Sequence, residues 1–186
     1  MGNMLLDGVP SRPTRGIGGH TAPNKGATDS WITPRIIIES LGPFDLDPCQ
    51  CTPQPWTCAK VGYTIDQNGL SNPWFGRVWL NPPYSDAWTW ISRLASHGSG
   101  TALIFARTET AGFVRNVWKR ATAIMFLHGR LSFHLPDGTK ASGNSGGPSC
   151  LVAYGKIDSD ALSHSGLDGT FLLLNPDPSQ RTLLDA

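Results

Sequence analysis

The chain has 186 residues, of which 39% are hydrophobic and 16% charged, and its formal net charge is +1. This length favours one domain with a substantial core, and the near-zero charge excludes a chain that is basic throughout, although its 15 Lys and Arg residues can still form a local patch for nucleic acid. No run of 18 apolar residues and no apolar secretory segment at the N-terminus is found, so we expect a cytoplasmic chain without a membrane span.

The first part of the chain differs in composition from the rest. Residues 1–28 are rich in Gly, Pro, Thr and Arg and show no hydrophobic periodicity, which predicts a flexible N-terminal arm. Ordered patterns begin near Ser30 and no internal repeat follows, so we expect residues 29–186 to form a single domain.

Short elements come first. TPRIIIESLG (33–42) predicts a helix, because Pro34 lies near its start and Gly42 follows its end. PFDLDP (43–48) predicts a short strand, and residues 49–60, with three cysteines and two prolines, predict a loop. Two further strands are predicted for VGYTI (61–65) and GRVWLN (76–81).

Longer elements follow. SDAWTWISRLASHG (85–98) predicts a helix because Trp88, Ile91 and Ala95 recur at helical spacing, and TAGFVRNVWKRA (110–121) predicts an amphipathic helix. Four apolar runs predict strands: TALIFA (101–106), AIMFL (123–127), SCLVAYG (149–155) and GTFLLLN (169–175). The alternation predicts a three-layer α/β fold, with a mostly parallel sheet flanked by helices and a β-rich C-terminal part.

The tetrad Asn81-Pro82-Pro83-Tyr84 directly follows a predicted strand, at the end where such sheets bind ligands. It is either a turn that ends the strand or a rigid polar clamp for a planar nitrogen heterocycle. The exocyclic amine of adenine is a poor nucleophile because its lone pair is delocalised into the ring. Asn81 Oδ1 and the Pro82 carbonyl can accept its two hydrogens and stabilise the positive charge that grows during methyl transfer. Pro83 stiffens the loop and Tyr84 offers a ring to the base.

The cysteines allow a metal reading as an alternative. Cys49, Cys51 and Cys58 lie close together, with Cys150 far along the chain. The spacing contains no Cys-x-x-Cys pair and no nearby His, so it fits zinc poorly. We expect reduced thiols and no metal.

Seven short motifs occur in an order and spacing that one known family shares: DSWITP (29–34), FDLDPC (44–49), NGLSNPW (68–74), VWLNPPYS (78–85), ARTET (106–110), HGRLSF (128–133) and, more loosely, SCLVAYG (149–155). In these the chain resembles the small phage- and prophage-encoded DNA N6-adenine methyltransferases of the Dam type. The resemblance covers about residues 29–155 and implies a Rossmann-like methyltransferase fold, S-adenosylmethionine as cofactor and a flipped adenine in double-stranded DNA as substrate. One departure is that DPCQCT (47–52) stands where larger methyltransferases have a Gly-rich turn.

The resemblance implies residues on the cofactor side. Trp31, Thr33 and Pro34 would lie against the methionine end, and Asp47 would face the cofactor's amino group. Asp66 is a candidate for the ribose hydroxyls, although a turn-forming Asp is the alternative at both acidic positions. The full implied set is Trp31, Thr33, Pro34, Asp47, Pro48, Cys49, Asp66 and Asn81.

On the DNA side, Tyr84 is joined by three charged residues at predicted strand ends. Arg107 can meet phosphate with Glu109 orienting it, or this segment is the capped, acidic start of a helix. Arg130 is a candidate for phosphate or the base, or a surface charge.

Other functions remain open from the sequence alone. The acceptor can instead be an RNA base, cytosine N4 or a protein glutamine, or the chain can be a non-catalytic nucleic-acid-binding phage protein, against which the intact tetrad argues. No separate target-recognition domain is evident, and only the loops 49–60 and 136–148 and the C-terminal tail are candidates for that role. We therefore expect a short or relaxed target.

Overall fold

The computed structural model describes residues 31–175, so the arm predicted for residues 1–28 lies outside the described residues. Within residues 31–175 the fold is a mixed α/β arrangement built on one seven-stranded sheet, in the order β2-β1-β3-β4-β6-β5-β7. The predicted α/β class is confirmed. No helix in this range is long and apolar enough to cross a membrane.

The elements have the following bounds. The strands are β1 (Leu46–Asp47), β2 (Val61–Gly62), β3 (Val78–Leu80), β4 (Gly100–Phe105), β5 (Ala123–Leu127), β6 (Ser149–Tyr154) and β7 (Gly169–Leu173). The helices are α1 (Arg35–Leu41), α2 (Ala87–His97), α3 (Ala111–Phe113) and α4 (Lys156–Ser163), with single turns at η1 (Ile65–Gln67) and η2 (Tyr84–Asp86) and a π-helical segment η3 (Val114–Trp118).

The sheet is less parallel than the sequence predicts. Strands β1 to β5 run in one direction, while β6 and β7 run in the other. Because β6 lies between β4 and β5 and β7 lies outside β5, three of the six pairings in the described sheet are antiparallel. The prediction of a mostly parallel sheet thus holds for strand direction, but the sheet is mixed.

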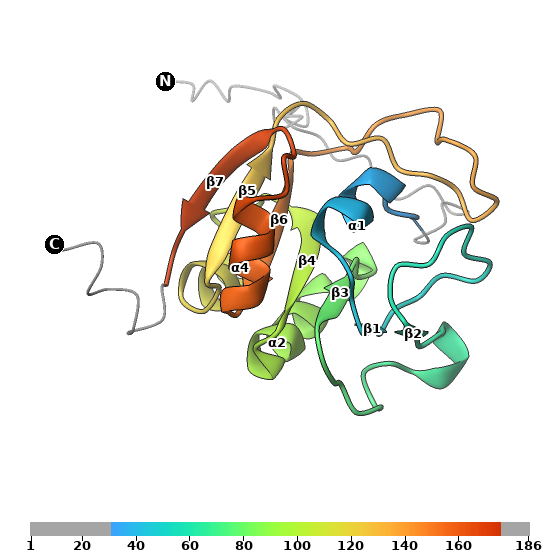
Figure 1. The fold of residues 1–186 in the computed structure, drawn as a ribbon, viewed down its shortest axis with the longest axis horizontal. Coiled ribbons are helices and arrows are strands. Elements are labelled where there is room, and N and C mark those ends of the chain that lie inside the picture. The colour runs from blue at the N-terminus through green and yellow to red at the C-terminus, as the bar shows by residue number, and fades with distance from the viewer. Residues whose placement is uncertain (1–30, 176–186) are drawn as a thin grey trace, which may run out of the picture.

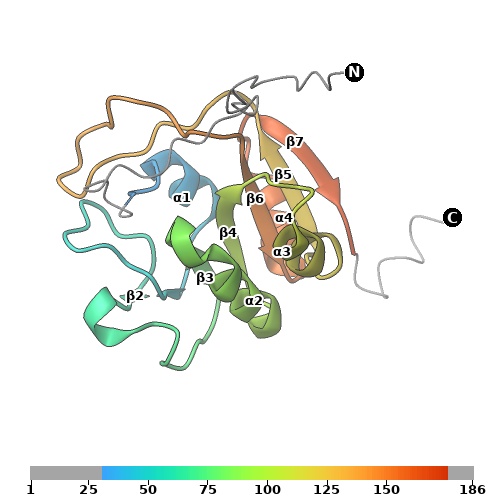
Figure 2. The same ribbon diagram turned by 180° about the vertical axis from the view of Figure 1, so that it is seen from behind.

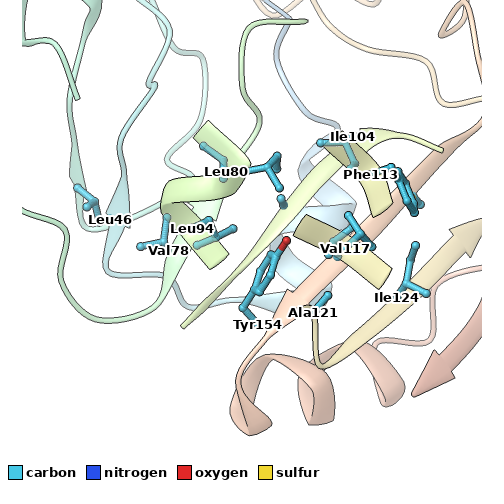
Figure 3. Packing of buried hydrophobic residues seen from close by; sticks show 14 residues of the cluster. Leu46, Val78, Leu80, Leu94, Ile104, Phe113, Val117, Ala121, Ile124 and Tyr154 are labelled. Carbon is cyan, nitrogen blue, oxygen red and sulfur yellow. The ribbon is translucent and has the colours of Figure 1, made fainter. Parts of the chain in front are cut away.

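Helices cover both faces of the sheet, as predicted. Figure 1 shows α1 and α4 on the near face, and the reverse view in Figure 2 shows α2 and α3 on the other. Neighbouring residues of β4 face opposite layers, because Ile104 packs in one hydrophobic cluster and Leu103 in a second. Figure 3 shows the first cluster, in which Leu94 of α2 and Val117 of η3 pack on the sheet.

The strand predicted for residues 61–65 is shortened to β2 (Val61–Gly62) and is followed by the turn η1, and two further elements differ from the sequence prediction. The helix predicted for residues 110–121 is divided between α3 and η3, although Phe113, Val117 and Ala121 are fully buried on one side as expected. Helix α4 lies in the tail that was predicted to be β-rich. Its sequence KIDSDALS is mostly polar, and only a Lys156–Asp160 ion pair and the buried Leu162 show the helical spacing.

Candidate active site

The candidate site lies where the parallel strands β1, β3 and β4 end. Leu46 of β1 pairs with Val78 of β3, so the loops that leave these two strands start side by side. The thiol of Cys49 donates to the carbonyl oxygen of Asn81 at 3.2 Å and joins the two loops. The predicted cofactor segment and the proline tetrad therefore meet at one edge of the sheet.

The Asn81 side chain is held in one orientation. Its Nδ2 donates to the carbonyl oxygen of Trp31 at 2.7 Å. Because a carbonyl oxygen only accepts, this bond requires the amide nitrogen on the Trp31 side. Among the described residues no donor reaches Asn81 Oδ1 or the Pro82 carbonyl oxygen. Two oxygen acceptors on adjacent residues are thus available to a ligand.

Several predicted cofactor residues border one large cavity, which we name the Pro48–Asn81 cavity. It has a volume of about 450 Å³. Four of the implied residues line it, namely Trp31, Pro48, Cys49 and Asn81. The other described lining residues are Gln50, Cys51, Thr52, Thr64, Ile65, Asn68, Gly69, Pro83, Ser85 and Trp90.

A recess of about 20 Å³ adjoins this cavity and shares Trp31, Cys49 and Asn81 with it. The recess is lined by Thr33 and Asp47, which are 2% and 5% exposed. The Thr33 hydroxyl oxygen is buried without a hydrogen-bond partner in the described part of the chain. The recess therefore presents polar groups that a ligand can satisfy.

Asp47 is a buried carboxyl group. The backbone N–H of Cys49 donates to its Oδ1 at 3.1 Å, but no ion pair with a Lys or Arg of residues 31–175 is present. Burial raises the pKa of Asp47 to about 7, and the hydrogen bond from the Cys49 backbone offsets only part of this effect. A cationic ligand group would supply the missing counter-charge.

Two implied cofactor residues lie outside these cavities. Pro34 precedes the first residue of α1 and sets the start of that helix. Asp66 is exposed on η1, and its neighbours Ile65 and Asn68 line the Pro48–Asn81 cavity in its place. Neither Pro34 nor Asp66 borders the cavity or the recess.

A second cavity, which we name the Tyr84 cavity, has a volume of about 280 Å³. The Tyr84 ring stacks on Phe105, with centroids 4.4 Å apart and planes at 13°. Trp31 lines both the Tyr84 cavity and the Pro48–Asn81 cavity and thus stands between them. The described lining residues are Trp31, Tyr84, Phe105, Phe133, Leu135, Ala141, Ser142, Gly143, Asn144, Ser145 and Gly146, none of them charged.

The charged residues predicted on the DNA side lie on the surface. Arg107 is exposed beside Tyr84, with its guanidinium carbon 5.7 Å from the centroid of the Phe105 ring. Within the described residues Glu109 forms no ion pair with Arg107, so the structure does not show the predicted orienting contact. The cap of α3 is Thr110, after Glu109, and the first turn of α3 holds no acidic residue, so the alternative of a capped, acidic helix start at residues 107–109 is not found either. Arg130 is exposed outside both cavities.

Three of the four cysteines line the recess. Cys49, Cys51 and Cys58 all border it, and the four cysteines carry reduced thiols. In the part of the chain that the structure describes, no three His, Cys, Asp or Glu side chains are grouped so that they could hold a metal ion.

Sequence reasoning missed much of the Tyr84 cavity. Phe105 ends a strand that was predicted only as core, and Phe133 ends the motif HGRLSF without an assigned role. The loop 136–148 was a candidate for DNA contact, but its Gly- and Ser-rich sequence gives no signal that residues 141–146 lie beside Tyr84 in the same cavity.

Similarity to known proteins is found at the level of a protein family. Residues 20–164, well over half of the chain, match the family model described as DNA N-6-adenine-methyltransferase (Dam). The match begins inside the segment predicted as an arm. No curated protein and no solved structure matches the chain.

Proposed function

Because the chain belongs to the DNA N-6-adenine-methyltransferase (Dam) family, we propose that it transfers a methyl group from S-adenosylmethionine to the exocyclic amine of an adenine flipped out of double-stranded DNA. Methyltransferases of this family generally use that cofactor. The observation that carries the proposal is the fixed Asn81 amide, whose oxygen and the Pro82 carbonyl are both available, next to two cavities that share Trp31.

The Pro48–Asn81 cavity and its recess fit the cofactor. The buried Asp47 carboxyl and the unpartnered Thr33 hydroxyl suit the ammonium and carboxylate of its methionine end. Trp31, Cys49 and Asn81 line both the cavity and the recess, so the proposed methionine end would lie next to the tetrad. When bound, S-adenosylmethionine supplies an activated methyl group on a sulfonium.

Asn81 and Pro82 act on the acceptor amine. Each oxygen accepts one of its two hydrogens, which favours a more tetrahedral nitrogen and frees the lone pair for attack. The Trp31 carbonyl holds the Asn81 nitrogen, so the oxygen needs no reorganisation during the reaction. Once the nitrogen is methylated its extra proton is acidic, and no strong general base is required.

The target base must leave the duplex before it can reach Asn81, because its amine is paired in the stack. The aromatic Tyr84 cavity would receive the base, and Tyr84 would pack on its ring. Arg107, which is exposed next to Tyr84, would meet a phosphate at the rim.

The proposal is tested by expressing the chain in a host that lacks adenine methylation and analysing the nucleosides of its DNA. We expect abundant N6-methyladenine with the wild-type chain and far less with an Asn81→Ala control expressed at the same level. DNA without N6-methyladenine, despite folded protein in the cells, would argue against the proposal.

The aromatic ring of Tyr84 should contribute to substrate binding. Tyr84→Ala is expected to weaken binding of a duplex with 2-aminopurine at the target position by about 1–3 kcal/mol, the range for the loss of one base–aromatic stack. Tyr84→Phe keeps the ring and should bind within a few tenths of a kcal/mol of wild type. Fluorescence titration measures both, and equal binding by the Ala variant would remove Tyr84 from the base site.

The recognition sequence should be short or relaxed. The two loops that were candidates for target recognition lie against each other where Gly138 approaches Pro55, and they form no separate domain within residues 31–175. Most contacts should then be to phosphates, so that DNA affinity falls steeply with salt. Sequencing of methylated DNA checks this, and a single strict motif of six or more bases would contradict it.

A further inference from the structure

One side of the Tyr84 cavity has polar groups to which the proposed mechanism gives no role. Residues 141–146 contribute three polar side chains to it, those of Ser142, Asn144 and Ser145. The Ser145 hydroxyl is committed, because it donates to the Gly147 carbonyl at 2.9 Å. Within residues 31–175 the Ser142 hydroxyl and the Asn144 carboxamide have no hydrogen-bond partner. They are therefore available to a ligand in the cavity.

Two backbone hydrogen bonds anchor this segment, one near each end. The Ala141 N–H donates to the Phe133 carbonyl at 2.9 Å, and the Ser145 N–H donates to the Leu131 carbonyl at 2.6 Å. Asn144 thus lies between two anchored residues and next to the aromatic floor formed by Phe133. Its backbone is thereby held beside the cavity, and its exposed carboxamide has no hydrogen-bond partner within residues 31–175.

The chemistry of adenine decides which group is useful there. In the proposed mechanism Asn81 and Pro82 use both hydrogens of the amine, and the remaining polar atoms of adenine are ring nitrogens, which only accept. A recognising side chain must therefore be a donor. No charged side chain lines the cavity in the described part of the chain, and a carboxamide carries two donor hydrogens at the end of a side chain that is longer than serine.

We propose that Asn144 is a specificity-determining residue, which donates a hydrogen bond from Nδ2 to a ring nitrogen of the flipped adenine. This inference rests on the proposed function and deepens it. Asn144 takes no part in the chemical step, so its role appears in the choice of base.

The test combines variants with substrates that each lack one acceptor. Single-turnover kcat/KM is measured on duplexes that carry adenine, 1-deazaadenine, 3-deazaadenine or 7-deazaadenine at the target position. The wild-type enzyme should lose roughly 10-fold on the one analogue that lacks the contacted nitrogen. Asn144→Ala should lose roughly 10-fold on adenine and show no further loss on that analogue. Asn144→Asp should be slower still, because a carboxylate only accepts and repels a ring nitrogen.

Asn175→Ala is the matched control. It removes an exposed Asn that bonds backbone carbonyls near η3 and lines neither cavity, so it should keep the wild-type rates and their pattern across the substrates. Cofactor affinity should be unchanged in every variant, which checks that each has folded.

Two results would overturn the role of Asn144: wild-type kcat/KM on adenine for Asn144→Ala, or an equal loss on every substrate. Either can occur while the wild-type enzyme methylates adenine and Asn81→Ala does so far more slowly, in which case the proposed function stands. Failure of the wild-type enzyme to methylate adenine would instead reject the proposed function.

Discussion

Asn81→Ala is expected to lower the single-turnover rate of methyl transfer roughly 10²–10³-fold, the loss seen when one preorganised group that stabilises developing charge is removed. The substitution deletes Oδ1, one of the two oxygens that accept from the reacting amine, and the Nδ2 bond to the Trp31 carbonyl. The Pro82 carbonyl remains, so some activity should survive. Rapid mixing of the enzyme–cofactor complex with duplex DNA measures this rate.

Cofactor affinity separates a chemical from a structural role for Asn81. Although Asn81 lines the Pro48–Asn81 cavity, its proposed partner is the acceptor amine, so calorimetry with S-adenosylmethionine should give a nearly wild-type affinity for Asn81→Ala. If the variant methylates at the wild-type rate, the tetrad is only a turn. If it loses the cofactor instead, Asn81 belongs to cofactor binding.

Asp47→Asn should move stability and cofactor binding in opposite directions. The wild-type carboxyl has a pKa of about 7 in the folded protein because it is buried, compared with 3.8 for an accessible group. Ionising it in the folded state therefore costs on the order of 4 kcal/mol. Asn keeps an oxygen that can accept from the Cys49 N–H. Without ligand the variant should be more stable above pH 7, whereas S-adenosylmethionine should bind more weakly by about 1.5–3 kcal/mol.

The stability penalty from the buried Asp47 carboxyl depends on pH in a predictable direction. A raised carboxyl pKa means that the folded state keeps its proton while the unfolded state loses it. The penalty is absent below pH 3.8, grows as the pH rises to about 7 and is constant above that value. Urea unfolding of both proteins across this pH range measures it. Equal stabilities at every pH, or unchanged cofactor affinity, would contradict the placement of Asp47.

Asp45→Asn is a matched control for Asp47→Asn, because it makes the same change two residues earlier in the chain. Asp45 accepts from Lys60 Nζ at 2.8 Å and from the Arg77 N–H at 2.9 Å, and the Lys60 hydrogen bond is the main cause that lowers the pKa of Asp45. Its carboxylate therefore stabilises the fold above its unfolded pKa, and this contribution is lost as the pH falls. Asp45→Asn should reduce stability at neutral pH and leave cofactor affinity unchanged.

Much of the fold follows from local sequence signals. Pro34 and Gly42 bound α1 as predicted, and the apolar run AIMFL coincides with β5. The position of the tetrad at the carboxyl end of β3 could also be predicted. The alternation of strands and helices indicates parallel strands, and the carboxyl ends of parallel strands lie at the same edge of the sheet. Helix α4 was missed because its polar sequence shows few apolar positions. Its burial depends on contacts made only in the fold, such as the ion pair between Asp158 of α4 and Arg77, the residue before β3.

The candidate site was only partly readable for the same reason. Asp47 ends β1 and Asn81 directly follows β3. The order of elements therefore predicts that these two residues lie close together. The cavity position of Asn144 depends on contacts between residues that are distant in sequence or separated by loops, such as Ile32 with His134. Asp66 was assigned by analogy with a longer strand, but β2 ends at Gly62 and the chain turns at η1, which leaves the carboxylate exposed.

The central claim is tested most directly by incubating the purified full chain with double-stranded DNA and S-adenosylmethionine that carries an isotopically labelled methyl group. The DNA is digested to nucleosides, and each labelled product is identified by mass spectrometry. We predict that the label appears in N6-methyladenine with the wild-type chain and is nearly lost with Asn81→Ala. Label in N4-methylcytosine, or labelling confined to RNA or protein when these are offered, would contradict the account, as would a folded wild-type chain that binds the cofactor and transfers no methyl group.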